Sequence, residues 1–202
     1  PTSMTLESFV WADSWGAGPG SSLVFDALQD GNGFLVGVGE PDESGRGHVR
    51  VELWNNGTNQ VITTTRPAIE SGMRQHLAIS VDGNLASIWV NGLKEETTSV
   101  GAAVPPGPVS GAMKIGEGVE RIDDVRVWGG IRTDTEILAG MHVLEPAPDS
   151  ATLLGRYSFD APQVSAENTG GTAGSAWNGG LVGGQISTIA EEGPPVTHRL
   201  EV

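Results

Sequence analysis

Apolar and polar positions alternate along residues 74–98, RQHLAISVDGNLASIWVNGLKEETT. Apolar side chains occupy every second position in two runs, 77–81 and 86–90. Two hairpin signals, Asp82-Gly83 and Asn91-Gly92, flank the second run and supply residues that adopt positive φ at little cost. The stretch therefore predicts antiparallel strands with one buried face.

Short runs of the same kind recur along the chain and predict further strands. They cover residues 4–12, 22–27, 33–39, 47–54, 58–64, 112–117, 120–128 and 152–160. Turn signals recur about every eight to twelve residues, which is typical of a sandwich or barrel. Residues 99–111, rich in Pro and Gly, are expected to form a loop.

One helix is predicted near residues 133–141. Thr133 and Glu136 match a capping box, in which each side chain satisfies a free backbone N–H at the start of a helix. Ile137 and Met141 give it a short apolar face. A helix of about two turns is expected to plug an edge or end of the sandwich.

Composition narrows the possible partners. The 202 residues carry a net charge of −14, which repels phosphate backbones and argues against nucleic acid. No apolar run is long enough to insert into a membrane. Pro1 is not followed by a basic or apolar leader, as expected of a mature chain or an excised piece. The chain has no cysteine, which excludes disulfides and leaves the compartment open.

Six segments resemble motifs of laminin-G-like and pentraxin-like jelly rolls, which belong to the concanavalin A-like lectin and glucanase superfamily. They are residues 5–10, 76–83, 88–92, 121–128, 132–141 and 154–160. The resemblance implies an all-β fold of two antiparallel sheets in a jelly-roll sandwich, with one short helix.

The order of the motifs departs from the family. Segments like 154–160 and the Gly-rich loop at 176–181 open many relatives, yet here they come late in the chain. We therefore expect a single domain over residues 1–189, in which 152–189 packs beside the N-terminal strand or completes a neighbouring subunit. Residues 190–202 are expected to form an exposed tail.

The family resemblance raises two chemical possibilities. Glucanases of this superfamily carry carboxylates on alternate positions of one strand, but here Ile122 stands between Glu120 and Asp124, so catalysis is not expected. Relatives also bind calcium, and the matching ligands would be Asp160, Glu167, Asn168, Asp123 and Asp124. Alternatively, these are ordinary turn and ion-pair residues. A calcium ion here would be structural.

Tryptophans suggest where a sugar would bind, because an indole face stacks on a pyranose ring. Trp54, Trp89 and Trp128 lie in strand motifs and are expected in the core. Trp11, Trp15 and Trp177, with the neighbouring Asn178, are the predicted ligand-binding residues, because they lie in Gly-rich loops or at an exposed strand position.

The first hypothesis is a non-catalytic binding or adhesion module of an exported protein, acting outside the cell or at its surface. Its partner would be a carbohydrate or cell-surface glycan, or neighbouring domains of a larger protein. A second hypothesis is a structural subunit of a surface layer, sheath or filament assembled through its terminal strands. A third, less favoured one is a glucanase-type hydrolase.

Overall fold

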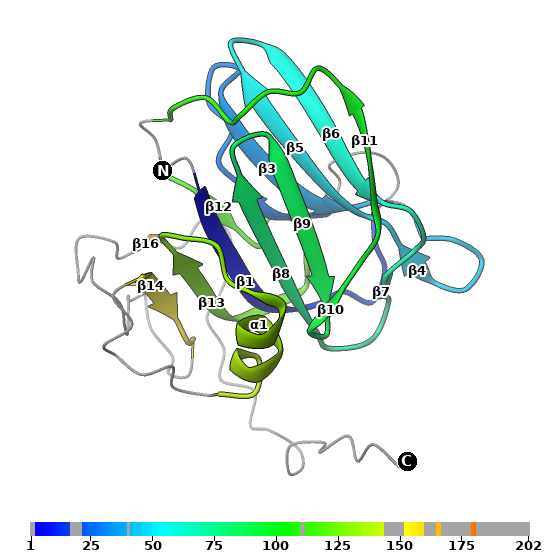
Figure 1. Ribbon diagram of the computed structural model, residues 1–202. Helices are drawn as coiled ribbons and strands as arrows, with labels where there is room; N and C mark the ends of the chain where they lie inside the picture. The colour runs from blue at the N-terminus through cyan, green and yellow to red at the C-terminus, as the bar shows by residue number, and fades with distance from the viewer. Residues whose placement is uncertain are drawn as a thin grey trace.

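The computed structural model describes residues 3–16, 22–39, 41–109, 112–143, 152–159, 165–166 and 179–180. Two six-stranded antiparallel sheets form a sandwich (Figure 1). Sheet I has the order β10 (Leu93–Lys94), β9 (Leu85–Val90), β8 (Gln75–Asp82), β1 (Ser3–Trp11), β13 (Arg121–Trp128) and β14 (Leu153–Tyr157). Sheet II has the order β11 (Thr97–Gly101), β6 (Thr58–Thr64), β5 (Val49–Asn55), β3 (Gly33–Val38), β2 (Ser22–Asp26) and β12 (Lys114–Ile115). The all-β jelly-roll sandwich predicted from the sequence is confirmed.

Two short strand pairs lie outside these sheets. They are β4 (Arg46–Gly47) with β7 (Ile69–Glu70), and β15 (Ser165–Ala166) with β16 (Gly179–Gly180). The described residues also contain one helix, α1 (Asp134–Gly140), and no helix there is long and apolar enough to cross a membrane.

The core lies between the two sheets because alternate side chains of each strand point inward. On β8 the inward residues Leu77, Ile79 and Val81 are at most 2% exposed. Burying an aliphatic side chain of this size contributes roughly 1.5–3 kcal/mol each, so the alternation fixes which face of every strand is internal.

The hairpins of the 74–98 meander use the turn residues that their geometry requires. Asn91 and Gly92 have φ values of 52° and 76°, as a type I′ turn needs. The preceding turn is one residue later than predicted: Asp82 pairs with Leu85, so the central residues are Gly83 and Asn84. Of these only Gly83 has positive φ, at 59°, which is the pattern of a type II′ turn.

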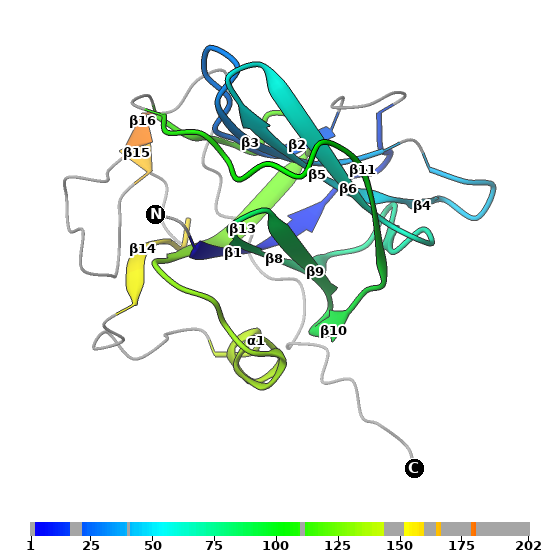
Figure 2. The ribbon, with the colours of Figure 1, turned by 45° about the horizontal axis from the view of Figure 1, so that its top comes forward.

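Two predictions about the fold need correction, and a third concerns a segment of which only part is described. Residues 97–101 form an edge strand, β11, which pairs with β6, whereas most of them were assigned to a loop. Helix α1 lies on the side of sheet I facing away from sheet II, rather than plugging an edge or end (Figure 2). Strand β14 pairs with β13, so β13 separates it from β1. Most of the remaining segment 152–189 lies outside the described residues.

Candidate functional site

The outer face of sheet I collects polar side chains beside α1. Because side chains alternate along a strand, Ser80 on β8 and Ser87 on β9 lie directly opposite each other on this face. Two positions along β9, Trp89 lies opposite Lys94 of β10. The pairing register alone therefore brings two hydroxyls, an indole and an ammonium group together.

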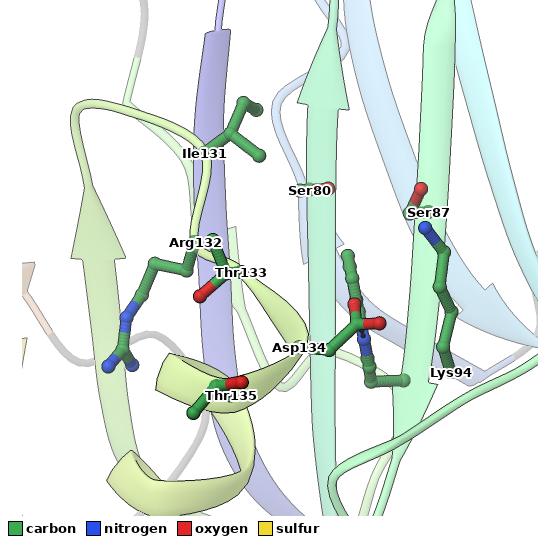
Figure 3. A pocket seen from close by; sticks show the side chains of 9 residues that line it. Ser80, Ser87, Lys94, Ile131, Arg132, Thr133, Asp134 and Thr135 are labelled. Atoms are coloured by element: carbon green, nitrogen blue, oxygen red, sulfur yellow. Dashed lines mark hydrogen bonds between the residues drawn. The ribbon is translucent and has the colours of Figure 1, made fainter.

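These residues form one wall of an open pocket of about 440 Å³ (Figure 3). Residues just before and at the start of α1 form the other wall. The lining residues are Ser80, Ser87, Trp89, Lys94, Ile131, Arg132, Thr133, Asp134 and Thr135. Figure 3 shows Ser87, Lys94 and Asp134 grouped together, whereas the side chain of Arg132 extends away from them.

Several polar groups of the pocket have no protein partner. Within the described ranges, no hydrogen bond or ion pair engages the side chains of Ser80, Ser87 or Lys94, although Lys94 Nζ lies 5.1 Å from the centre of the Trp89 ring. By contrast, Asp134 Oδ1 accepts a 3.0 Å hydrogen bond from Trp89 Nε1. The free hydroxyl and ammonium groups can therefore bind a polar ligand without breaking an internal contact.

The second wall of the pocket is fixed by the N-terminal cap of α1 and by the packing of this helix on sheet I. The predicted capping box is present: the Glu136 carboxylate accepts from the Thr133 N–H at 2.8 Å, and Thr133 Oγ1 accepts from the Glu136 N–H. The backbone hydrogen bond from Thr133 lowers the pKa of Glu136 below its ordinary value. Ile137 is fully buried against Ala78 and Trp89, which docks the helix on sheet I.

Beneath α1 lies a buried group of charged side chains centred on Glu7 of β1, which we call the Glu7 cluster: Glu7, His76, Asp124, Arg126, Arg132 and Arg156. The Glu7 carboxylate is 0% exposed. Arg132 Nη1 donates to its Oε1, while His76 Nε2 and Arg126 Nη1 lie 3.4 and 3.9 Å from its Oε2.

The electrostatics of the cluster favour an ionised Glu7. Burial by itself raises the pKa of this carboxyl, because a charge is poorly solvated inside the protein. The contacts with His76 and Arg132 outweigh that effect, and the pKa of Glu7 lies below its ordinary value. Glu7 is therefore a structural anion, and with no exposed surface it cannot reach a substrate.

The arginines of the cluster also tie α1 to the sheet. Arg132 donates to the carbonyl of Glu136 at 2.7 Å, and Arg126 donates to the carbonyl of Gly140 at 2.7 Å. Carbonyls in the last turn of a helix lack partners within it, so Arg126 satisfies one of them at Gly140, while Arg132 binds the carbonyl of Glu136 one turn earlier. Glu7 thereby orients the helix that forms the pocket wall, through Arg132.

The structure corrects the prediction for Trp15. Its side chain is 3% exposed and belongs to the core between the sheets, so no ring face is offered to a ligand. Trp11 is half-buried: its Nε1 donates to Asp13 at 3.0 Å, and the Arg121 guanidinium lies 4.7 Å from its ring centre. Trp177 and Asn178 lie outside the described residues, so their assignment stays a prediction.

The two predicted calcium ligands that the structure describes, Asp123 and Asp124, form ion pairs with arginines instead. Asp124 is buried and accepts from both Arg126 and Arg156, so a cation there would have to displace two guanidinium groups. Asp123 pairs with Arg74 at 2.9 Å. These residues do not fit a calcium site, and among the described residues no three acidic or histidine side chains group as metal ligands. Asp160, Glu167 and Asn168 lie outside the described residues.

The pocket residues were not predicted from the sequence, and a second tryptophan besides Trp15 lies elsewhere than predicted. Ser80, Ser87 and Lys94 carry no motif, and their only signal was their shared face in the 74–98 meander. Trp54, expected in the core, is half-buried on the outer face of sheet II, where its Nε1 donates to Glu52 at 3.0 Å. Trp89 and Trp128 are buried, as expected.

Comparisons with known proteins agree with this architecture. A family model for laminin-G-type domains, described as the concanavalin A-like lectin/glucanases superfamily, matches residues 1–138. The comparison with curated proteins found no match.

Solved structures share the fold at low sequence identity. Tailspike protein 2 of the Escherichia coli O157:H7 bacteriophage CAB120 matches with a TM-score of 0.54 and 15% identity, over 78% of this chain and 24% of that one. The botulinum neurotoxin serotype D binding domain matches with a TM-score of 0.52 and 6% identity, over 68% and 36%. The binding domain of botulinum neurotoxin DC, in complex with SialylT, matches with a TM-score of 0.50 and 13% identity, over 78% and 38%. The chain thus spans less than two fifths of each of these three proteins, and the likeness is one of fold.

Proposed function

Because the chain belongs to the concanavalin A-like lectin/glucanases superfamily, we propose that it is a non-catalytic binding module that holds a carbohydrate in the pocket beside α1. The observation that carries the proposal is a group of polar side chains gathered in that pocket, Ser80, Ser87 and Lys94, which form no hydrogen bond or ion pair with the described residues. A sugar presents hydroxyls that both donate and accept, which matches this set of groups. Neighbours of the same fold include a toxin binding domain in complex with SialylT.

A hydrolase is the less favoured reading for a chemical reason. Glycoside hydrolysis needs two carboxyl groups facing one cleft, an acid and a nucleophile or base. Among the described residues, Glu7 is fully buried and Asp124 is held by two arginines, and the pocket itself is lined by a single carboxylate, Asp134. We therefore propose binding without turnover, in an exported protein acting at a cell surface or outside the cell.

The two lysines of the chain make a matched pair for the test. Lys94 lines the pocket, whereas Lys114 lies on sheet II and pairs with Asp26 and Glu117. On a broad glycan array, the wild-type protein should bind a defined set of sugars. Lys94→Ala should weaken that binding about tenfold or more, since a hydrogen bond to a charged group contributes roughly 1.5–3 kcal/mol. Lys114→Ala should bind like the wild type.

Two results would contradict the proposal. One is the absence of binding across neutral and acidic sugars. The other is binding that Lys94→Ala and Lys114→Ala leave equally intact, which would place the sugar elsewhere, with the half-buried Trp54 and Trp11 as the next surfaces to test. Release of reducing sugar would overturn the non-catalytic part.

Calcium remains a proposal that concerns Asp160, Glu167 and Asn168 alone. A cation bound only by the folded chain raises its stability, so a chelator should lower the melting midpoint if the site exists. An unchanged midpoint would remove calcium from the description of this protein.

A further inference from the structure

The four edge strands of the sandwich differ in how they are protected. Strands β10 and β12 are two residues long, and each carries a lysine, Lys94 and Lys114. Short strands and lysines both discourage pairing with another chain. Strand β14 is half-buried. Strand β11 is five residues long and exposed at every position, with the sequence Thr-Thr-Ser-Val-Gly.

In the described part of the chain, β6 is the one strand that pairs with β11, so the other edge of β11 presents backbone groups for a further strand. The Thr65 N–H donates to the Glu96 carbonyl at 2.9 Å, just before the regular pairing of β11 with β6 begins. Hydrogen-bonded pairs alternate along antiparallel strands, so Thr98 and Val100 use their backbone groups on β6. The N–H and carbonyl groups of Thr97 and Ser99, and the N–H of Gly101, therefore point away from β6, whereas the positive φ of Gly101, 92°, ends the regular strand there.

We propose that β11 pairs with β11 of a second copy of this chain, antiparallel and centred on Ser99. The two Ser99 residues would then face each other, and Thr97 would face Gly101 of the other copy. The outward groups form about four backbone hydrogen bonds across the two-fold axis, two between the Ser99 residues and one for each Thr97–Gly101 pair. Sheet II then continues through both copies as one sheet.

The side chains of β11 favour pairing with a second copy of the same strand. The strand carries no charge, although the chain has a net charge of −14, so the two copies meet where like charges are absent. On the outer face, Val100 of each copy lies opposite Thr98 of the other, a contact between β-branched side chains. Val100 is 64% exposed in the single chain, and Leu93, at the same edge of the sandwich in β10, is 66% exposed.

Pairing of this kind has a consequence for the pocket, and this part rests on the proposed function. A two-fold axis relating two antiparallel strands stands perpendicular to their sheet, so both copies present the same face to the same side. Since sheet I is layered on sheet II, both pockets beside α1 open on one side of the pair (Figure 2). A surface carrying several glycans would then be bound by two sites at once, which raises avidity without any new contact.

Sedimentation equilibrium tests the pairing itself. The protein should sediment at twice its mass of 21.0 kDa as concentration rises. Added salt should strengthen the association, because it screens the repulsion between two acidic copies. Ser99→Pro removes the N–H at the axis and should weaken association about tenfold or more. Ser99→Ala keeps that N–H but removes the hydroxyl that accepts from Gln60 Nε2 at 2.7 Å, and it should still associate more tightly than Ser99→Pro. Circular dichroism checks that both variants fold.

A disulfide trap tests the register, because the chain has no cysteine of its own. Directly opposed residues of a hydrogen-bonded pair have Cα atoms about 5.5 Å apart, within reach of a disulfide. Ser99→Cys should therefore give a covalent dimer under mild oxidation. Val100→Cys should not, since the two Val100 positions are offset along the strands.

Three results would overturn the inference. They are a single-chain mass at every concentration and salt level, equal association of Ser99→Pro and Ser99→Ala, and equal cross-linking of the two cysteine variants. All three are measured without a sugar, so they do not depend on the outcome of the glycan array. Conversely, a failed array would leave the paired mass unchanged.

Discussion

Two groups of polar side chains share the outer face of sheet I and are used in opposite ways. In the Glu7 cluster, the carboxylate lies among His76 and two arginines, and those arginines hold carbonyls of α1. In the pocket next to it, Ser80, Ser87 and Lys94 form no hydrogen bond or ion pair within the described part of the chain. The charged groups of the first are paired with one another, although the buried Glu7 Oε2, His76 Nδ1 and Arg126 Nε have no hydrogen-bond partner among the described residues, whereas the polar groups of the second form neither hydrogen bonds nor ion pairs there.

The difference reflects the cost of burial. An unpaired buried charge is far more costly than a partly exposed hydroxyl, so charges under a helix have to be paired for the protein to fold. The hydroxyl of the half-buried Ser87 and the exposed ammonium group of Lys94 can stay solvated until a ligand replaces the water. On this face, paired polar groups support the structure and unpaired ones are available for binding.

The largest expected effect comes from breaking the Glu7 cluster. Glu7→Gln removes the anion that faces Arg126 and Arg132, and loss of one partner of a buried ion pair costs roughly 3–5 kcal/mol. Urea denaturation at pH 7 measures this loss. The matched control is Glu70→Gln, whose surface pair with Arg46 should contribute at most about 1 kcal/mol. Equal losses in the two variants would show that the cluster is no more than a surface pair.

Acid should weaken the protein through the same residue. The pKa of Glu7 is lowered in the folded state, so its stabilising effect is complete well above the ordinary value of 4.5. As pH falls below that value, the carboxyl is protonated in the unfolded chain but still ionised in the folded one. The free energy of unfolding therefore decreases until the pH reaches the lowered pKa of the folded state. The free energy of unfolding, followed by urea titration from pH 7 to pH 3, should fall more steeply for the wild type than for Glu7→Gln.

Other carboxylates also lose stabilising contacts in acid, and their contribution is common to the wild type and the variant. The pKa values of Glu136 and Asp42 are also lowered, by hydrogen bonds with Thr133 and Ser44 respectively, and both residues are unchanged in Glu7→Gln. Identical pH profiles for the wild type and the variant would show that Glu7 does not contribute to the acid sensitivity.

An intermediate effect is expected at the cap of α1, which joins the two groups. Thr133→Ala removes the side chain that accepts from the Glu136 N–H, and loss of such a cap costs about 1 kcal/mol. Thr135→Ala, two residues on in the same helix and without a cap contact, should change stability by about 0.5 kcal/mol or less. Thermal melting compares the two, and equal midpoints would argue against a stabilising capping box.

The smallest effect on stability should come from the pocket. Ser87→Ala removes a hydroxyl with no internal partner, so the free energy of unfolding should shift by about 0.5 kcal/mol or less. Sugar binding should nevertheless weaken, as measured by calorimetry with a sugar that the array identifies. A large loss of stability would show that Ser87 belongs with the structural group.

Most of the fold could be predicted because local signals and burial agree. The period-2 pattern of β8 and β9, the Asn91-Gly92 turn and the Thr133 cap each depend on residues close together in sequence. Strand β11 could not be recognised in this way. All five of its residues are exposed, so it lacks the apolar alternation that marks a half-buried strand, and its pairing with β6 comes from residues more than thirty positions away.

The site was less predictable for the same reason. Trp15 seemed exposed because its neighbours are glycines, yet its ring fills space between the sheets, which depends on contacts far away in the sequence. The Glu7 cluster joins residues from β1, β8, β13 and β14 with Arg132 before α1, and the pocket joins β8, β9 and β10 with α1. Pairing register and the placement of α1, rather than any local motif, bring these side chains together.

Two consecutive residues, Glu95 and Glu96, connect the two layers of the sandwich. The Glu95 N–H donates to the Ile88 carbonyl in sheet I, while the carbonyl of the next residue, Glu96, accepts from the Thr65 N–H beside sheet II. Lifting β10 from its neighbour therefore pulls on β11, and the reverse also holds. This side of the molecule should open as one cooperative unit, so amide protons of the β9–β10 hairpin and of β6 should exchange with solvent at linked rates.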